Sequence, residues 1–317
     1  ILSLALIFLM IGFNLDPKKA SWSIVWASFI QGFLAIGQFI NQTVLANKWL
    51  GMSAQDPSIQ GVPVVQVGEM RWLRTFGSLP HPNILAAFLV IGLIMIMGLF
   101  IYSENKKHKR ILNLFFVINT IALLTTLSKA AILTFVFAII LFNFLSRKDK
   151  VFARGSSRFA LIALFIIVAF TVSYPSLIIT RTTSANHIEN NSTISRVEQY
   201  KQFWPVIKSN WTTGTGLNNY TLEIEKQNLD QPGYSYQPIH NTYLLIWAET
   251  GIVGLAGGIL LIFYLLHRLI KRKEWPIFKI TGFTCLTCLA CLAIFDHYLW
   301  SYYFGLMLLA IIIGFNL

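Results

Sequence analysis

The chain has 317 residues, of which 55% are hydrophobic and only 12% are charged, and its formal net charge at pH 7 is +12. A soluble domain of this length could not bury so much apolar surface, so the composition excludes an ordinary water-soluble protein and favours a membrane protein. The positive charge alone would suit a nucleic-acid-binding protein, but most basic residues lie in short segments between apolar runs, so nucleic acid is not an expected partner.

Long apolar runs follow one another along the chain, and a helix of about 20 such residues crosses the hydrocarbon core of a bilayer. In chain order, the predicted spans are residues 1–14, 22–40, 83–102, 111–127, 130–145, 159–176, 241–266, 277–295 and 298–316. These nine spans predict an all-α, multi-pass integral membrane protein, with residues 1–317 forming a single membrane domain. Because Ile1 opens directly into an apolar run, we expect the natural chain to begin further upstream and count nine spans as a minimum.

The loops between the spans differ in charge. Sixteen of the 25 lysine and arginine residues lie in four short loops, at residues 18–19, 106–110, 147–158 and 268–279. An excess of basic residues in short loops marks the cytoplasmic side of a membrane, so these loops are predicted to be cytoplasmic. The long polar segments 41–80 and 177–239 are then predicted to lie outside.

The segment 177–239 is expected to form an ordered extracytoplasmic subdomain that roofs a cavity between the spans. Ser195 and Glu198 have the spacing of a capping box, which predicts that a helix begins there, with a kink at Pro205. The stretch "TTGTGLNNY" that follows is typical of a turn. Helical spacing links Ile194, Val197, Lys201, Trp204 and Ile207.

Residues that could bind a metal occur in two places, and neither predicts a metal site. Cys285, Cys288 and Cys291 have a permissive spacing, but they lie inside a predicted span and are interpreted as small apolar residues. Glu223 and Glu225 form an acid-x-acid pair, which is also typical of an ordinary polar face. We therefore expect no bound metal, and the sequence contains no P-loop for nucleotide binding.

His240 stands out among the outer histidines because it lies at the mouth of the predicted span 241–266. On a continuous helix, the residues within about 60° of its direction are Tyr243, Trp247, Gly251, Gly254 and Gly258. Gly254 and Gly258 have the small-xxx-small spacing of a close contact between membrane helices. Two readings stay open: a titratable group held at the end of a rigid crevice, or a capping histidine above a packing motif.

Glu249 lies within the same predicted span, about 13 Å from His240 along the helix axis and on nearly the opposite face. An ionised carboxylate at that depth would be costly, so we expect this side chain to be neutral or paired. A structural hydrogen bond between helices is the favoured interpretation, and a proton route or cavity is the alternative.

The segment "HNTYLLIWAETGIVG" has the pattern His, Asn, nine residues, Gly, two residues, Gly, at His240, Asn241, Gly251 and Gly254. This pattern resembles that of the O-antigen ligase and O-antigen polymerase superfamily. Three further stretches resemble the same family in the same order: "RTFGSLPHPNILAAFL", "TLSKAAIL" and "SRVEQYKQFWPVIKSNWTTGTGLNNY". The resemblance covers roughly residues 70–300, and Lys129 stands where the family usually has arginine.

The resemblance implies a GT-C-like glycosyltransferase of the bacterial plasma (inner) membrane, with its active site on the extracytoplasmic side and without a cofactor. Its expected partners are a polyprenyl-diphosphate-linked glycan donor, a glycan or lipid-linked acceptor, and the lipid bilayer. His240 is the expected general base, and Arg196, Arg74 and Lys129 are the expected diphosphate-binding cations. Asn241, Gly251 and Gly254 are expected to form the helix-packing motif. Ligase and polymerase activities both stay open.

A rival function is a membrane transporter or flippase of lipid-linked oligosaccharide that performs no transfer chemistry. Such transporters commonly have internal repeats and broken helices. No internal repeat is visible in the sequence, and the long polar segments are predicted to lie on one side of the membrane only. A membrane subunit without chemistry is a third alternative, which the outer arginines disfavour.

Overall fold

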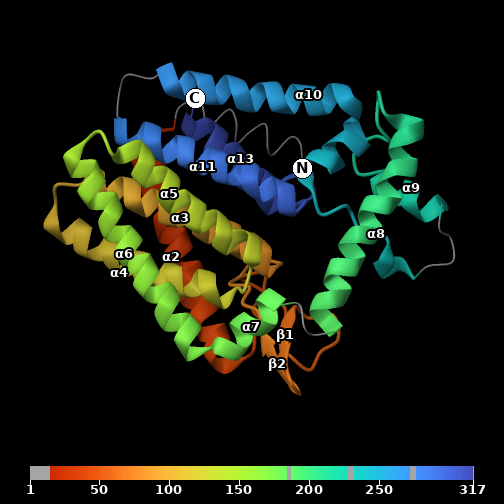
Figure 1. Cartoon of the computed structure of the whole chain (residues 1–317), viewed down its shortest axis with the longest axis horizontal. Helices are drawn as coiled ribbons and strands as arrows, with labels where there is room; N and C mark the ends of the chain where they lie inside the picture. The colour runs from red at the N-terminus through yellow and green to blue at the C-terminus, as the bar shows by residue number, and fades with distance from the viewer. Residues whose placement is uncertain (1–14, 184–186, 228–231, 272–275, 317) are drawn as a thin grey trace. The chain divides into compact units, whose positions relative to one another are not determined.

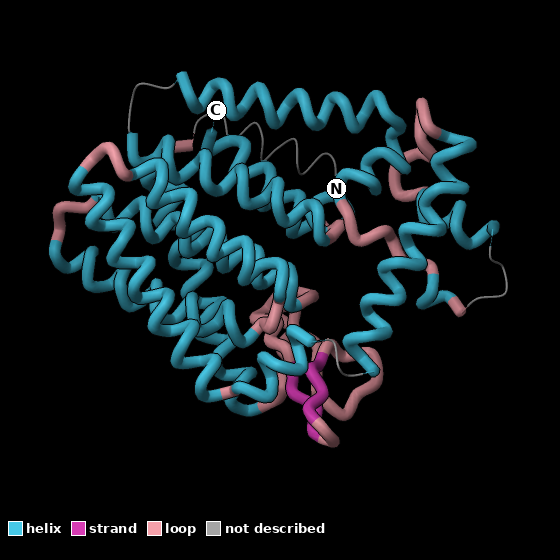
Figure 2. Tube along the Cα trace, in the orientation of Figure 1, coloured by secondary structure: helices cyan, strands magenta, loops and turns pink. Residues whose placement is uncertain are grey.

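A computed structural model of the chain describes residues 15–183, 187–227, 232–271 and 276–316 (Figures 1 and 2). Helices make up most of this described part. It divides into two compact units, which we call the first unit, residues 14–189 with 272–288, and the second unit, which among the described residues comprises 190–271 and 289–316.

The first unit is a helical bundle around one central helix. Its helices are α2 (Pro17–Asn41), α3 (Pro82–Tyr102), α4 (Lys106–Thr125), α5 (Lys129–Ser146), α6 (Lys150–Ser173) and α7 (Pro175–Thr183). Helix α3 is apolar on all sides and is buried along its length, because α2, α4, α5 and α6 all pack against it. The side chains of Asp16, Asn105 and Asp149 cap the first turns of α2, α4 and α6.

The segment before α3 contains a small hairpin, formed by β1 (Val64–Val67) and β2 (Met70–Leu73) and drawn in magenta in Figure 2. The strands are antiparallel and Val64 pairs with Leu73. Gly68, with φ of 59°, occupies the first position of the two-residue turn, where glycine adopts positive φ without strain. The expectation of an all-α chain is therefore correct for most of the described residues but missed this hairpin, which packs against α7.

The second unit contains the helices of the long polar segment before α10 and the last helices of the described chain. Its elements are α8 (His187–Asn210), α9 (Tyr220–Gln227), a 3-10 turn η1 (Gly233–Ser235), α10 (Thr242–Lys271), α12 (Tyr298–Ser301) and α13 (Tyr303–Asn316). Helix α11 (Pro276–Phe295) begins in the first unit and ends in the second. The core of the loop region is formed by Phe203, Val206, Ile207, Tyr220, Ile224, Ile239, Leu245 and Ala248.

Six helices of the described chain are long and apolar enough to cross a membrane: α2, α3, α5, α6, α10 and α11. The predicted span 1–14 lies outside the described residues, and the predicted span 111–127 falls on α4, whose first turn is basic. The predicted span 298–316 is not one helix. The backbone is extended at Tyr302, which separates α12 from the 14 residues of α13. Hydropathy does not change at this break, so the apolar pattern could not reveal it.

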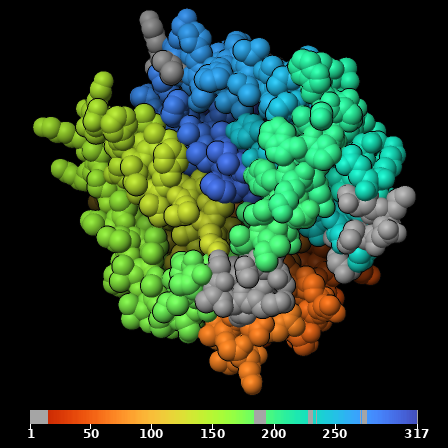
Figure 3. Space-filling view, turned by 45° about the vertical axis from the view of Figure 1, so that its right-hand side comes forward, coloured from red at the N-terminus to blue at the C-terminus, as the bar shows by residue number. Residues whose placement is uncertain are grey.

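Helix α8 differs from its prediction in two ways. It begins at His187 rather than at the Ser195 capping box. Ile207 is buried as its spacing suggested, but Ile194, Val197 and Trp204 are more than half exposed. Helix α8 lies on the molecular surface in Figure 3, drawn in green. Its buried side instead consists of Gln199, Phe203, Val206 and Ile207, because α9 and α10 supply the partners for that face.

Helix α10 is broken at Gly251, where φ is 70° and ψ is −177°. Almost only glycine adopts such angles, and a Cβ at this position would collide with the backbone carbonyl of Thr212. The backbone N–H groups of Thr215 and Gly216 donate to the carbonyls of Ala248, at 2.8 Å, and Glu249, at 2.9 Å. The predicted "TTGTG" turn therefore docks into the break and pairs carbonyls that the helix has released.

This break corrects the treatment of residues 240–258 as one continuous helix. The calculated alignment of His240 with Gly254 and Gly258 does not hold across it, since directions on a helix carry over only where the backbone is regular. Among the described residues, a Cβ at Gly254 would meet the side chain of Thr250 in its own helix rather than another helix. Gly258 has open space around it.

Candidate catalytic site

His240 lies in the second unit, immediately before α10. The side chain of Asn241 accepts a hydrogen bond from the backbone N–H of Leu244 at 3.0 Å, so Asn241 is the cap of α10. The carboxamide oxygen of Gln199, a buried residue of α8, lies 3.3 Å from the His240 backbone nitrogen and 2.8 Å from its Nδ1. Gln199 of α8 thus contacts both the backbone and the ring of His240.

These contacts determine the tautomer of His240. An amide oxygen only accepts hydrogen bonds, and the Gln199 oxygen already accepts one from the backbone N–H of His240. The ring Nδ1 must therefore carry the proton that it donates to the same oxygen, and Nε2 keeps its lone pair. This is the form of imidazole that can accept a proton.

Asp296 and His297 lie beside His240, in the turn between α11 and α12. The two imidazole rings are 5.1 Å apart between centroids and nearly perpendicular, at 84°. One ring nitrogen of each histidine and a carboxylate oxygen of Asp296 lie within 4.8 Å of one another. The hydroxyl of Thr242 donates to the backbone carbonyl of Asp296 at 2.7 Å, which fastens the start of α10 to this turn.

The ring of His297 contacts Ser301. Its Nδ1 lies 2.5 Å from the Ser301 hydroxyl oxygen, and the same hydroxyl lies 3.0 Å from the His297 carbonyl. A hydroxyl both donates and accepts, so Ser301 is able to accept from Nδ1–H when its own proton points to the carbonyl. Two imidazoles and one carboxylate therefore share one site, in which Asp296 and His297 are buried.

Burial controls the ionisation of both histidines. It lowers the pKa of His240 below its ordinary value, while the nearby Asp296 opposes this shift and Arg196 adds to it. Burial lowers the pKa of His297 to about 4, again against the effect of Asp296. Both rings are therefore neutral at pH 7, so His240 is a proton acceptor and not a cation.

Arg196 joins the same site from α8. It lies three residues before Gln199, so the two side chains share one face of the helix. Its positive charge acts on both histidines. The structure thus brings together two sequence-predicted residues, His240 and Arg196, with three that the sequence did not single out as a site. We call Arg196, Gln199, His240, Asp296 and His297 the His240 cluster.

Residues 112–259 match the model of the Wzy_C family, described as O-antigen ligase. The match covers a little less than half of the chain. It runs from α4 into α10 and includes Lys129, Arg196 and His240. No curated protein matches the chain. Together with the six helices of the described residues that are long and apolar enough to cross a membrane, this match supports a membrane protein with a part in surface polysaccharide assembly.

Two cations predicted from the family resemblance, Arg74 and Lys129, belong to the first unit. The buried Arg74 donates from Nε to the Thr126 carbonyl at 2.9 Å and from an Nη to the Asn83 side chain at 2.7 Å. Arg181 donates from Nε to the adjacent carbonyl of Leu127 at 2.9 Å, and the exposed Lys129 begins α5 just after it. Three cations therefore gather at the α4–α5 turn.

Glu249 of the O-antigen ligase segment has a structural environment. It is buried, and its carboxylate accepts a hydrogen bond of 2.7 Å from the Trp300 indole N–H on α12. This is the contact between helices that the sequence favoured for it. Glu223, one member of the acid-x-acid pair, forms an ion pair of 2.6 Å with Lys226 in α9. One carboxylate of this possible metal-binding pair is therefore already engaged in an ion pair.

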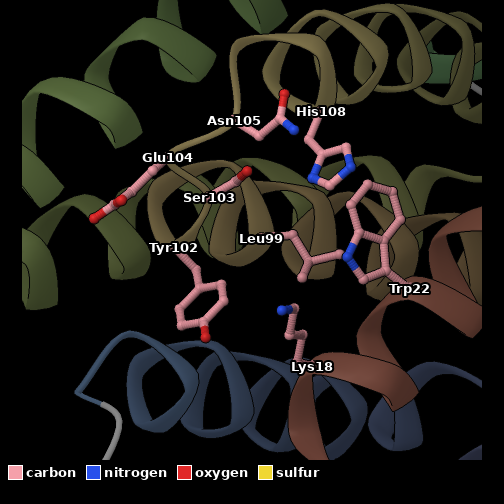
Figure 4. A pocket seen from close by; sticks show the side chains of 8 residues that line it. All are labelled: Lys18, Trp22, Leu99, Tyr102, Ser103, Glu104, Asn105 and His108. Carbon is pink, nitrogen blue, oxygen red and sulfur yellow. The ribbon is translucent and has the colours of Figure 1, made fainter.

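A separate pocket of about 360 Å³ lies in the first unit (Figure 4). Lys18 and Trp22 of α2 face Tyr102, Asn105 and His108 across it. The Lys18 ammonium lies 5.5 Å from the Tyr102 ring centre, and the Trp22 and His108 rings meet edge to face. These residues border the loops predicted to be cytoplasmic, so the pocket is not part of the outer site proposed for O-antigen ligase chemistry.

Proposed function

We propose that this protein is a glycosyltransferase of the outer face of the bacterial plasma membrane. It would transfer a glycan from a polyprenyl diphosphate to a sugar hydroxyl, as an O-antigen ligase or a surface polysaccharide polymerase. The observation that carries this proposal is the neutral His240, whose ring is fixed by Gln199 and whose site also feels the charges of Asp296 and Arg196. The family match supports the same class of reaction.

The His240 cluster contains groups for both halves of such a transfer. Nε2 of His240 takes the proton of the acceptor hydroxyl while that oxygen bonds to the anomeric carbon of the donor glycan. The bond from this carbon to the diphosphate breaks, and its electron pair leaves with the diphosphate. Asp296 stabilises the imidazolium that forms, and Arg196 neutralises the growing negative charge on the leaving group.

The remaining predicted residues have supporting roles in this proposal. Arg74 and Lys129 remain predicted contacts for the diphosphate. Asn241, directly after His240, caps α10, Gly251 permits the break in α10, and Gly254 remains a predicted helix-packing residue. We propose that arginine and lysine perform the charge neutralisation for which many glycosyltransferases use a metal, so no cofactor is required. A GT-C-like arrangement with nine or more spans belongs to the same proposal.

The rival transporter function has one observation in its favour, the broken helix α10, because discontinuous helices often bind substrates or ions in transporters. In this chain, however, the carbonyls released at the break accept hydrogen bonds from Thr215 and Gly216. They are thus engaged by the protein itself. The enzyme proposal is therefore the better supported of the two.

The decisive experiment is reconstitution of the purified protein in proteoliposomes with a polyprenyl-diphosphate glycan and candidate acceptors. We expect glycan to appear on the acceptor, with release of the lipid diphosphate, and we expect His240→Ala to abolish most of this signal. Translocation of the intact donor across the bilayer without any transfer would contradict the proposal and support the flippase. Comparing a lipid A-core acceptor with a second copy of the repeat unit separates ligase from polymerase.

A further inference from the structure

We propose that His240, Asp296 and His297 also form a site for a divalent transition metal of the zinc type, and that its occupancy inhibits transfer. The inhibitory part rests on the proposed function, because it assumes that His240 is the base. The metal site itself does not, since it follows from the ligand atoms that two separate parts of the second unit, residue 240 and the turn at residues 296–297, bring together.

The ligand set is the one that zinc prefers. Two imidazole nitrogens and a carboxylate oxygen are common zinc ligands, and three protein ligands with one open position are typical of an accessible rather than a structural site. These atoms lie within 4.8 Å of one another. Ligand atoms around a tetrahedral zinc are about 3.3 Å apart, given metal–ligand bonds of about 2.0–2.2 Å. Side-chain rotations that move the ligand atoms by about 1 Å would therefore complete the site.

The surroundings of the two histidines match those of metal ligands. A metal-binding histidine usually donates its other ring N–H to a neighbouring acceptor, which fixes the ring and directs the lone pair at the metal. Gln199 supplies this acceptor for His240, and Ser301 supplies it for His297. The backbone N–H of His297 donates to Asp296 Oδ1 at 2.8 Å and orients the carboxylate. Both Asp296 and His297 are only 8% exposed.

Charge indicates that binding is reversible. Two neutral imidazoles and one carboxylate leave a net charge of about +1 on a bound divalent ion. Arg196 shares a face of α8 with Gln199, and its positive charge weakens binding further. A chelator would therefore remove the ion. While bound, it occupies the Nε2 lone pair that would otherwise take the acceptor's proton, and transfer stops.

The metal site is tested first without any transfer assay. Purified protein in nanodiscs, with its affinity tag removed, is titrated with Co²⁺, whose visible absorption reports tetrahedral coordination, and zinc is then used to displace it. We expect one bound cobalt per chain, with affinity at least tenfold lower in His297→Gln and in Asp296→Asn. The matched control is His267→Gln, which changes an exposed histidine of α10 outside the cluster. Melting temperatures confirm that all variants are folded.

Equal cobalt affinity in the wild type, His297→Gln and Asp296→Asn would overturn the site, as would the absence of a tetrahedral spectrum. The transfer assay then tests inhibition: zinc should suppress wild-type turnover at least tenfold, and a chelator should restore it. Activation by zinc would overturn the inhibitory role. If cobalt binds as described but transfer is absent even with chelator, the proposed function fails and the metal site stands. If transfer occurs but cobalt does not bind, the metal site fails and the proposed function stands.

Discussion

At the scale of single residues, the properties of His240 come from neighbours that are far away in sequence. Gln199 fixes its tautomer, Asp296 lies ready to stabilise its protonated form, and burial keeps it neutral. A lone histidine at the end of a helix has none of these advantages. Substitutions of His240, Arg196 and Gln199 should therefore separate the contributions of these residues to glycan transfer.

His240→Ala should lower the transfer rate by about 100- to 10,000-fold, the usual effect of losing a positioned base, with little change in donor affinity. Arg196→Ala should weaken both donor binding and turnover, because the diphosphate loses a charge partner in the ground state and the transition state. Arg196→Lys should restore only part of the donor binding and turnover, since lysine lacks the planar guanidinium fork. Donor binding and single-turnover rates in nanodiscs measure both effects. Near wild-type transfer by His240→Ala would show that His240 is only a structural residue.

Gln199→Leu should reduce turnover by about tenfold or more while donor affinity is retained, because the His240 ring loses the acceptor that fixes Nδ1–H. Gln202→Leu, on the same helix but outside the cluster, is the matched control. The informative measurement is turnover at saturating donor together with the melting temperature. An equal loss in both variants would mean that the effect is general damage to α8.

The pH dependence follows from the depressed pKa of His240. The base works only when neutral, so kcat/KM should fall as pH drops through this pKa, and the fall should come at a pH below the ordinary histidine value of about 6.5. Arg196 lowers this pKa and Asp296 raises it, while His297 is neutral in this range. Arg196→Ala should therefore move the acidic limb to higher pH and Asp296→Asn to lower pH. The profiles are measured with chelator present, and an acidic limb that neither substitution moves would argue against His240.

At the scale of elements, the shape of α10 depends on its break at Gly251. Gly251→Ala should destabilise the protein strongly, because alanine cannot adopt φ of 70° with ψ of −177° without strain and its Cβ would collide with Thr212. We expect a loss of at least about 1–3 kcal/mol. Gly257→Ala in the same helix has open space and should be tolerated. Thermal unfolding in detergent compares the two, and equal melting temperatures would mean that the break is not required.

The elements that the sequence predicted well are those whose signal is local. Apolar runs located α2, α3, α5, α6, α10 and α11, and the "TTGTG" stretch was correctly interpreted as a turn. The extended residue Tyr302 and the break at Gly251 were missed, because a change of backbone direction leaves hydropathy unchanged. The buried face of α8 was also missed, since its partners come from α9 and α10.

For the candidate site, the pattern from His240 to Gly254 and the family resemblance pointed to the histidine and to Arg196. Asp296 and His297 could not be assigned to it, because they lie 56 and 57 residues further along the chain and only tertiary contacts bring them to His240. A polar pair between two apolar runs, in "AIFDHYLW", was the available signal. Such a pair is also typical of an ordinary loop, so the sequence did not distinguish the two cases.

At the scale of the whole molecule, the basic loops predict which side of the membrane each segment faces. Cysteines placed at Gln227 and at Lys107, in a background where Cys285, Cys288 and Cys291 are alanine, should react differently with a membrane-impermeant thiol reagent. We expect labelling of intact cells at Gln227 only, with Lys107 labelled after lysis. Labelling of Lys107 from outside, with Gln227 protected, would overturn the orientation and with it the outer active site.

The docking of the "TTGTG" turn into the break of α10 couples the stability of the loop that carries the turn to the stability of the helix. If the turn left, the carbonyls of Ala248 and Glu249 would lose their donors near the apolar phase, at a cost of several kcal/mol for each group that found no water. The amide protons of Thr215 and Gly216 should therefore exchange with solvent slowly, at rates set by the opening of α10. We therefore expect the loop that carries this turn and α10 to unfold as one cooperative unit, and a loop transplanted from another protein would succeed only if it brought its own two donors.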